Sequence, residues 1–126
     1  MIQLREIKKT YVLGKTKVEA LKGINLRVKK GEFVCVVGPS GSGKSTLLNI
    51  IGCLDQPDSG EVIVDNEKIT NLNRNQLADF RANKIGFIFQ SFNLIPVLNV
   101  YENIELPLLF MREQMPAKEK RAKLMQ

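Results

Sequence analysis

The sequence predicts an α/β fold in which antiparallel strands come first and a partly parallel sheet follows. Two short runs of β-favouring residues, 33–37 and 84–90, are typical of strands that are buried on both faces of a sheet. A glycine-rich loop and stretches with helical spacing lie between these runs, so strands and helices alternate along the chain. With 126 residues, 44% of them apolar and 25% charged, the chain has the size and composition of one ordinary domain.

The first elements are two strands that are expected to pair as antiparallel neighbours. Residues 2–8 and 18–28 alternate between apolar and polar side chains, a GKTK turn lies between them, and a KKGE turn follows. After the glycine-rich loop, apolar residues recur at helical spacing, which predicts a helix over residues 44–53. The turn DQPDSG then leads into EVIVDNEKI, which reads as a strand with a hairpin-like Asp-Asn turn.

Two capping patterns predict where later helices begin. The motifs NRNQ at residues 73–76 and NVYE at residues 99–102 both place an N-cap asparagine three positions before a Gln or Glu that reaches back. We expect the second of these helices to bend at Pro107. A last helix is predicted from near Pro116 and has no stop signal before Gln126, so we expect a truncated chain that ends within an element.

Composition argues against several classes of protein. No run of about eighteen apolar residues occurs, and the N-terminus lacks the apolar segment of a signal peptide. Cys35 and Cys53 lie in apolar surroundings without metal-ligand spacing, and the chain has no histidine, so both are expected to pack in the core of a reduced, cytosolic protein. The net charge of +6 is spread along the chain, and its densest group, residues 118–123, is interpreted as a solvated helix face.

A glycine-rich loop carries the clearest functional signal. The motif G-x-x-x-x-G-K-[ST] is matched in full by Gly38, Pro39, Ser40, Gly41, Ser42, Gly43, Lys44 and Ser45. Its glycines let the backbone curl and bring its N–H groups against a phosphate chain, and the following helix points its positive end at the β-phosphate. Lys44 adds a full charge toward the β- and γ-phosphates, Ser45 offers a hydroxyl to Mg²⁺, and Thr46 can reach the α-phosphate.

The alternative explanation of this loop is a flexible Gly/Ser linker. A chance match to the motif in a chain of this length has odds of well under about one in fifty, and the flanking strand and helix lower them further. ATP and Mg²⁺ are therefore the expected ligands. The loop alone does not choose among kinases, GTPases, motor ATPases and transporters, although many small GTPases begin almost directly with the loop, whereas this chain has residues 1–37 before it.

Two stretches resemble the ATP-binding subunit of an ABC transporter, over essentially the whole chain but only the first half or so of such a domain. GPSGSGKSTLLNIIGCLDQPDSGEV resembles the family's Walker A loop, and IGFIFQSFNLIPVLNVYENIELPLLF resembles its Q-loop region. The second stretch is similar to the branch that contains macrolide-export and lipoprotein-releasing ATPases. The resemblance implies an ABC-type P-loop NTPase fold, with the β subdomain and P-loop core in residues 1–90 and the start of a helical subdomain in residues 91–126.

The resemblance also implies roles for individual residues. Gln90 would be the Q-loop glutamine, whose amide reaches Mg²⁺ or the attacking water, so Gln90 and Lys44 are the implied catalytic residues and Gln90 and Ser45 the implied metal ligands. The alternative for Gln90 is a polar residue that merely closes a strand. Tyr11 would stack on adenine, with Val18 near the same base.

The partners of the chain are likewise implied by the resemblance. The apolar region 91–98 would meet a cytoplasmic helix of the transmembrane permease subunit, the alternative being burial under the helices that follow. In the complete protein, a second ATP-binding subunit would pair with the first as a homodimer that sandwiches ATP. This places the protein in the cytoplasm, peripheral on the cytoplasmic face of the inner or plasma membrane, with no nucleic acid expected.

The groups that hydrolysis still needs are not found in these residues. Phosphoryl transfer requires a residue that positions water, a carboxylate on Mg²⁺ and a group that stabilises the transferred charge. The family supplies them from an LSGGQ-type signature, a Walker B aspartate with its adjacent glutamate, and a switch histidine, none of which occurs here. We therefore expect an ATP-hydrolysing transporter subunit as the parent protein, and nucleotide binding without turnover from this chain alone.

Two further expectations concern the class of protein and its stability. A nucleic-acid-associated ATPase is the least favoured alternative, because FRANK at residues 80–84 offers too little basic and aromatic surface.

In the family, the Walker B strand lies beside the strand predicted at 33–37. Without it, we expect residues 33–37 to be exposed at a sheet edge and the chain alone to be poorly stable.

Overall fold

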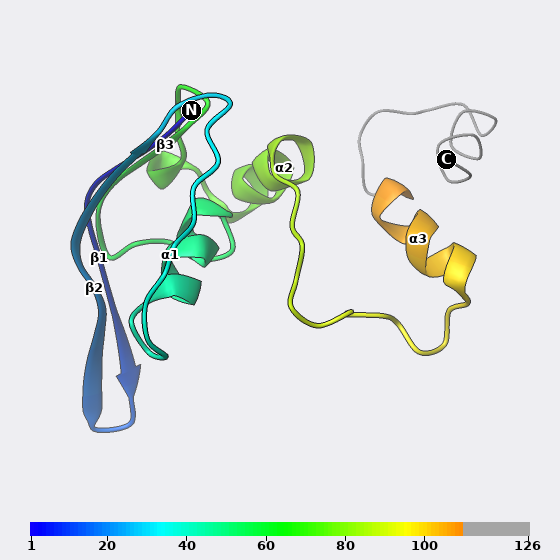
Figure 1. Ribbon diagram of the computed structural model, residues 1–126, viewed down its shortest axis with the longest axis horizontal. Coiled ribbons are helices and arrows are strands. Elements are labelled where there is room, and N and C mark those ends of the chain that lie inside the picture. Colours follow the sequence, from blue (N-terminus) through cyan, green and yellow to red (C-terminus); the bar gives the residue numbers. More distant parts are fainter. Residues whose placement is uncertain (110–126) are drawn as a thin grey trace. The chain divides into compact units, whose positions relative to one another are not determined.

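A computed structural model describes residues 1–109 of the chain (Figure 1). These residues belong to two compact units, Met1–Ala78 and Asp79–Gln126, each of which is considered by itself. The helix predicted from near Pro116 and the charged group at residues 118–123 lie outside the described part. Within the described part, no helix combines the length and the apolar character needed to cross a membrane.

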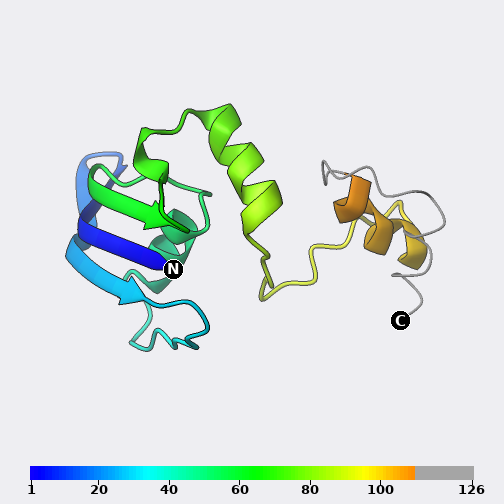
Figure 2. The same cartoon turned by 90° about the horizontal axis from the view of Figure 1, so that it is seen from above.

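The first unit contains a four-stranded antiparallel sheet. Its strands are β1 (Ile2–Leu13), β2 (Thr16–Val28), β3 (Ser59–Val64) and β4 (Glu67–Lys68). They are arranged in the order β2-β1-β3-β4, so β1 lies between β2 and β3 (Figure 2). The predicted pairing of the first two strands is confirmed. Both strands extend further toward the turn than predicted, because residues 9–13 and 16–17 also pair across the hairpin.

The turn between β3 and β4 is the predicted Asp-Asn turn. Asp65 and Asn66 have φ angles of 50° and 67°. A two-residue hairpin of type I′ requires positive φ at both central positions, which Asp and Asn tolerate better than most residues. The local sequence therefore fixes this hairpin.

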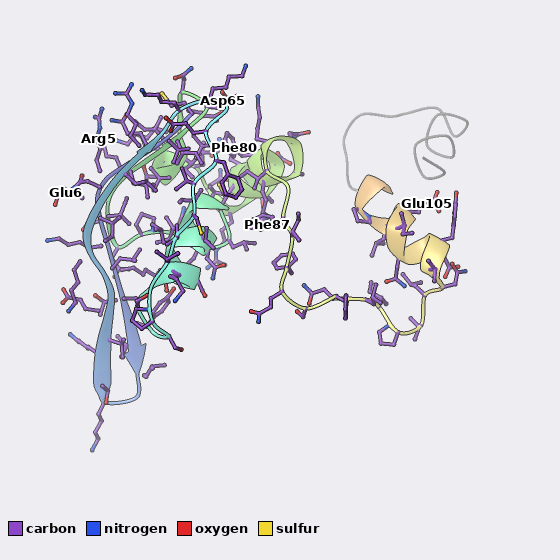
Figure 3. The ribbon with its side chains drawn as sticks, viewed as in Figure 1. Arg5, Glu6, Asp65, Phe80, Phe87 and Glu105 are labelled. Atoms are coloured by element: carbon purple, nitrogen blue, oxygen red, sulfur yellow. The ribbon has the colours of Figure 1, made fainter. Side chains whose placement is uncertain are left out.

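A bulge in β1 changes which residues face the core. The register shifts after Leu4 with β2 and after Arg5 with β3, and Glu6 has a φ of 49°. Leu4 and Ile7 are consequently both buried although they are three positions apart, whereas a regular strand alternates every second residue. Arg5 and Glu6 are exposed and project from the same side of the sheet (Figure 3).

The core of the first unit lies between this sheet and helix α1 (Lys44–Ile51). The helix buries Leu47 and Ile50 on one face, and the sheet contributes apolar side chains from three strands. The most buried members of the sheet are Leu4, Ile7, Leu21, Val62 and Val64. Cys53, just after α1, is buried as predicted.

The two runs predicted to be buried strands do not form strands in the described part of the chain. Residues 33–37 and 84–90 have no sheet pairing, and the side chain of Phe33 is 96% exposed. A strand needs a neighbour to satisfy its backbone N–H and C=O groups, and no described strand supplies one here. All pairs of the described sheet are antiparallel, so the expected parallel part is not formed by these residues.

Two further predictions concerned residues 33–37, namely their exposure and the burial of Cys35. The exposure of residues 33–37 is confirmed for most of their side chains, although no sheet edge forms there. The prediction that Cys35 packs in the core is wrong, because this residue lies in the unpaired run and is exposed.

Both predicted capping boxes are present. At the start of α2 (Arg74–Lys84), the backbone N–H of Asn73 donates to the side chain of Gln76 over 2.9 Å, and the reciprocal bond measures 3.0 Å. At the start of α3 (Val100–Leu109), Asn99 and Glu102 exchange the same pair of bonds over 2.8 and 2.9 Å. Pro107 lies inside α3.

The side chain of Asn103 holds the loop before α3 through several hydrogen bonds. The side chain of Asn103 accepts a hydrogen bond from the Ile95 N–H at 2.8 Å and donates to the carbonyls of Leu98 and Asn99 at 3.0 and 2.9 Å. One amide thereby satisfies several backbone groups of the preceding turn. This residue fixes the backbone of the region predicted to contact a permease.

Candidate functional site

The glycine-rich loop leads directly into α1, which begins at Lys44 as predicted. Residues 38–42 are exposed, and the loop closes with a hydrogen bond from the Ser42 N–H to the Pro39 carbonyl at 3.3 Å. Gly43 is the N-cap residue and has a φ of 90°, in the left-handed region that glycine adopts without strain. The backbone N–H groups of the first helical turn therefore face this exposed loop.

The side chain of Lys44 turns back over the loop. Its ammonium donates to the carbonyls of Gly38 and Pro39 over 2.8 and 2.6 Å, and it lies 3.5 Å from the Ser42 hydroxyl. A full positive charge and the positive end of α1 thus meet at one place. An anionic phosphate accepts hydrogen bonds more strongly than a neutral carbonyl, so this arrangement suits a phosphate ligand.

Position 43 requires glycine for steric reasons as well as for its place in the motif. A Cβ atom at this position would lie 2.5 Å from the Ala20 carbonyl oxygen of β2 and 3.1 Å from the Leu21 side chain. The helix N-terminus therefore approaches β2 more closely than any other residue type permits. By contrast, Gly41, with a φ of 77°, has no atom within 4 Å of such a Cβ.

Tyr11 lies in a cluster of polar contacts on β1. It stands directly opposite Val18 of β2, so the two residues predicted to contact the base are cross-strand neighbours. The phenol donates a hydrogen bond of 2.8 Å to the Asp55 carboxylate, and the side chain of Thr46 lies close to it. The structure therefore brings Tyr11 together with Thr46, which was predicted to reach the α-phosphate.

Lys9 and Asp55 are members of this cluster that the sequence did not reveal. The Lys9 ammonium lies 2.8 Å from Asp55 Oδ1, 2.6 Å from the Gln56 carbonyl, and 5.3 Å from the centre of the Tyr11 ring. Lys9 and Tyr11 are two positions apart on one strand and hence share a face, which is the only local signal for this contact. Asp55 follows α1, and nothing in its sequence neighbourhood points to β1.

The environment keeps the phenol neutral and the carboxylate charged. Burial raises the pKa of Tyr11, and the hydrogen bond to Asp55 raises it further. Burial alone would raise the pKa of Asp55, but the hydrogen bonds from Lys9 and Tyr11 outweigh it and hold the pKa below its usual value. Tyr11 is thus a donor and Asp55 an ionised acceptor at neutral pH.

Replacing Asp55 with asparagine is expected to remove a pH-dependent part of the stability. The folded-state pKa of Asp55 lies below the unfolded value of about 3.9, so its contribution is present above that value and is lost as the pH falls through the folded pKa. The free energy of unfolding of the unsubstituted protein should fall more steeply from roughly pH 5 to pH 3 than that of the variant. Urea denaturation at each pH measures this, and parallel profiles would contradict it.

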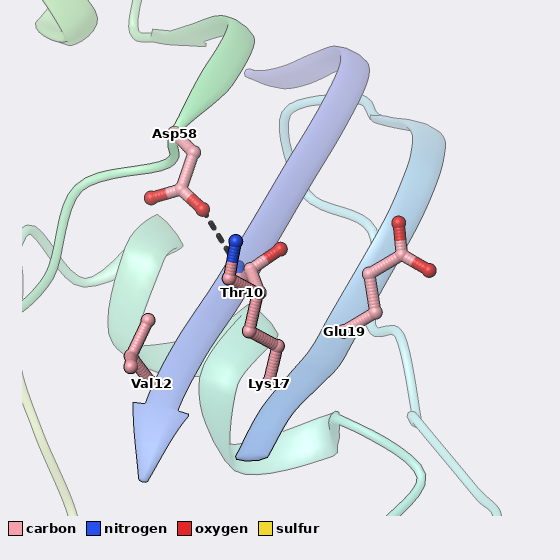
Figure 4. A pocket seen from close by; sticks show the side chains of 5 residues that line it. All are labelled: Thr10, Val12, Lys17, Glu19 and Asp58. Atoms are coloured by element: carbon pink, nitrogen blue, oxygen red, sulfur yellow. Dashed lines mark hydrogen bonds between the residues drawn. The ribbon is translucent and has the colours of Figure 1, made fainter. Parts of the chain in front are cut away.

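A shallow pocket of about 610 Å³ lies close to Tyr11 but does not include it (Figure 4). It is lined by Thr10, Val12, Lys17, Glu19 and Asp58. Thr10 pairs with Glu19 and Val12 with Lys17, so by strand alternation these side chains point to the face opposite Tyr11 and Val18. None of the predicted nucleotide-binding residues lines this pocket, which we do not assign to the nucleotide.

Gln90 and the region after it belong to the second unit. Gln90 is exposed and does not end a strand, and its roles stay predictions. In the region 91–98, Phe92 and Val97 are 93% and 88% exposed, which disagrees with burial under the following helices for these two side chains. Leu98 is half-buried.

Comparison with known proteins identifies the family of the chain. A family model described as ABC transporter matches residues 21–126. The chain is 53% identical over 127 residues to the uncharacterized ABC transporter ATP-binding protein MJ0796 of Methanocaldococcus jannaschii, covering 100% of this chain and 54% of that protein. It is 46% identical over 110 residues to the macrolide export ATP-binding/permease protein MacB of Bdellovibrio bacteriovorus, covering 87% of this chain and 17% of that protein.

Solved structures show the same likeness. The dimeric, post-hydrolysis structure of the ATP-binding cassette MJ0796 with ADP and Pi matches with a TM-score of 0.91 at 52% identity, over 99% of this chain and 54% of that one. The chain thus spans about half the length of this relative. The match confirms the predicted ABC-type P-loop NTPase fold. With a family model matched over most of its length and a relative more than half identical, the chain belongs to the ABC transporter family.

Proposed function

We propose that the chain forms the nucleotide-binding part of an ABC transporter ATPase and binds Mg-ATP through its glycine-rich loop and the start of α1. The proposed binding residues are Gly38, Pro39, Ser40, Gly41, Ser42, Gly43, Lys44, Ser45 and Thr46. The observation that carries the proposal is the Lys44 ammonium, which lies over this loop at the N-terminus of α1. The related M. jannaschii cassette is bound to ADP and Pi, which supports a nucleotide as the ligand.

The proposed site has a phosphate side and a base side. On the phosphate side, Lys44 neutralises the β- and γ-phosphates and Ser45 supplies an oxygen to Mg²⁺, which prefers hard oxygen ligands and shares them with phosphates. On the base side, Tyr11 stacks on adenine beside Val18, a pair supported by their cross-strand register. The side chain of Thr46 lies close to the Tyr11 phenol, so the two sides adjoin.

ATP hydrolysis is proposed for the parent protein and not for these 126 residues alone. Gln90 would contribute an amide oxygen to Mg²⁺ or to the attacking water, and Lys44 would stabilise charge on the transferred phosphoryl group. No histidine and no buried run ending in Asp-Glu occurs in the sequence, so the groups that activate water are not supplied by this chain. The chain alone should therefore bind nucleotide without turnover.

The proposed partners follow from the relatives. Two solved structures of the M. jannaschii cassette are dimeric, which supports a homodimer of the complete protein. The MacB relatives are ATP-binding/permease proteins, which supports a transmembrane permease as the second partner. We assign the exposed region 91–98 to that contact, and with it a peripheral position on the cytoplasmic face of the membrane.

Calorimetric titration and phosphate release test the proposal. The full-length protein should bind ATP in the presence of Mg²⁺ and be competed by ADP, whereas the 126-residue chain should release no phosphate above background. Failure of the full-length protein to bind ATP would overturn the proposed site. Phosphate release by the 126-residue chain that disappears on Lys44→Ala would show that the chain does supply the water-activating groups.

Tyr11→Ala is expected to weaken ATP binding by roughly tenfold, because stacking of a base on an aromatic ring contributes about 1–3 kcal/mol. The affinity for inorganic tripolyphosphate, which has no base, should stay unchanged. Competition of each ligand against a fluorescent ATP analogue measures both values. An equal loss for ATP and tripolyphosphate would contradict a contact with the base and would point to damage to the loop.

A further inference from the structure

We propose that Asp55 is a positioning residue that fixes the Tyr11 ring for the base of the nucleotide, with Lys9 selecting which face of the ring the base uses. The proposal rests on the proposed function, in which Tyr11 contacts adenine. It adds two residues to the site that neither the glycine-rich loop nor the Q-loop region contains. Its basis is the way one carboxylate holds two side chains of β1.

The two oxygens of Asp55 have separate partners on the same strand face. Oδ2 accepts a hydrogen bond of 2.8 Å from the Tyr11 phenol, and Oδ1 accepts one of 2.8 Å from the Lys9 ammonium. Lys9 is itself held by the Gln56 carbonyl at 2.6 Å, and its side chain is only 13% exposed. The carboxylate is therefore anchored rather than free to follow the ring.

These contacts determine both torsions of the tyrosine side chain. The phenol oxygen lies on the long axis of the ring, so fixing it to Asp55 sets the direction of that axis. Rotation about the axis remains, and the Lys9 ammonium, 5.3 Å from the ring centre, limits it by a cation–π contact on one face. A stacking base is consequently directed to the other face. A ring held in this way loses little further freedom on binding, which raises affinity.

Asp55 also relates the base side of the site to its phosphate side. The residue follows α1 and is tied to the helix by the bond from its own N–H to the Asn49 carbonyl at 3.2 Å. The other end of α1 carries Lys44 and the loop, and Thr46 of its first turn lies close to the same phenol. Through Asp55, Tyr11 is therefore linked to the end of the helix opposite the phosphate-binding loop, and this link sets its distance from the loop.

A double-mutant cycle in the full-length protein tests this assignment. Tyr11→Phe removes the phenol but keeps the ring, and Asp55→Ala removes the carboxylate. Each change alone should weaken ATP binding by roughly three- to tenfold, the range that one typical hydrogen bond contributes. The double variant should be no weaker than the single variants, because both changes delete the same bond. Glu67→Ala, which removes an exposed carboxylate on β4, is the matched control and should have no effect.

Inorganic tripolyphosphate separates positioning from a purely structural role. Its affinity should be unchanged in both single variants, since it makes no contact with the ring. Asp55 does not act through Tyr11, and the inference is wrong, if Asp55→Ala weakens the binding of tripolyphosphate as much as that of ATP. The same holds if the losses of ATP affinity in the two single variants add in the double variant. Should Asp55→Ala fail to fold, Tyr11→Phe tests the same bond from its other side, and an unchanged ATP affinity there overturns the inference.

The same measurements distinguish failure of the inference from failure of the proposed function. If Tyr11→Ala leaves ATP affinity unchanged, the base does not contact Tyr11, and both proposals about this side of the site fall. If Tyr11→Ala weakens ATP binding while Tyr11→Phe and Asp55→Ala do not, the base contact stands and only the positioning role of Asp55 is overturned.

Discussion

Lys44→Ala is expected to lower the affinity for ATP by roughly 10- to 100-fold, a larger effect than that expected of Tyr11→Ala. The ammonium is the one full positive charge bonded within the loop, and it bonds to carbonyls of Gly38 and Pro39 that phosphate oxygens can replace as acceptors. Removing it leaves those carbonyls exposed to water, so the fold itself should be little affected.

The pattern across ligands identifies the cause of this loss. Lys44→Ala should weaken the binding of ATP and of inorganic tripolyphosphate in parallel, because the lysine acts on phosphates. Tyr11→Ala should weaken the binding of ATP alone. Lys30→Ala, in an exposed turn, removes the same charge from the surface and serves as the control. Calorimetry of the full-length protein gives the dissociation constants. An ATP affinity that survives Lys44→Ala would mean that the nucleotide binds elsewhere.

The elements that the sequence predicted well are those with local causes. The Asp65–Asn66 turn, the start of α1 at Lys44 and the two capping boxes each depend on residues within a few positions of one another. Their geometry follows from side-chain chemistry that short segments already contain. The same holds for the glycine-rich loop, whose motif and flanking helix are contiguous.

The elements that the sequence predicted poorly depend on distant neighbours. Residues 33–37 and 85–89 have strand-like composition, but a strand exists only where another strand pairs with it, and the described residues offer no such partner. Composition also assigned Cys35 to the core by the same reasoning. Its exposure follows directly from the missing pairing.

The candidate site shows the same division between local and distant causes. Lys44, Ser45 and Thr46 could be identified from the loop motif alone. Asp55, however, meets Tyr11 from 44 positions away, through the path of α1 and the turn that follows it. Neither hydrophobic periodicity nor a motif encodes that contact, which arises only once β1 and α1 share a core.

Gly43→Ala is expected to lower the free energy of unfolding by about 2–5 kcal/mol, even without nucleotide. Two costs add at this position. A residue with a Cβ at a φ of 90° loses about 1–2 kcal/mol, and overpacking against the Ala20 carbonyl, 2.5 Å from the new carbon, adds about 1–3 kcal/mol. Because a backbone oxygen of a paired strand cannot rotate away, β2 or α1 must shift.

Gly41→Ala is the matched control for this prediction, since Gly41 lies in the same loop, also has a positive φ, and faces open space. It should lose only the conformational cost of about 1–2 kcal/mol. Urea unfolding of both variants without ligand measures the difference. Equal losses would show that the close approach of α1 to β2 contributes nothing. A larger loss for Gly43→Ala would mean that this glycine serves the packing of the helix as well as the phosphate, so that the fold requires it before any ligand binds.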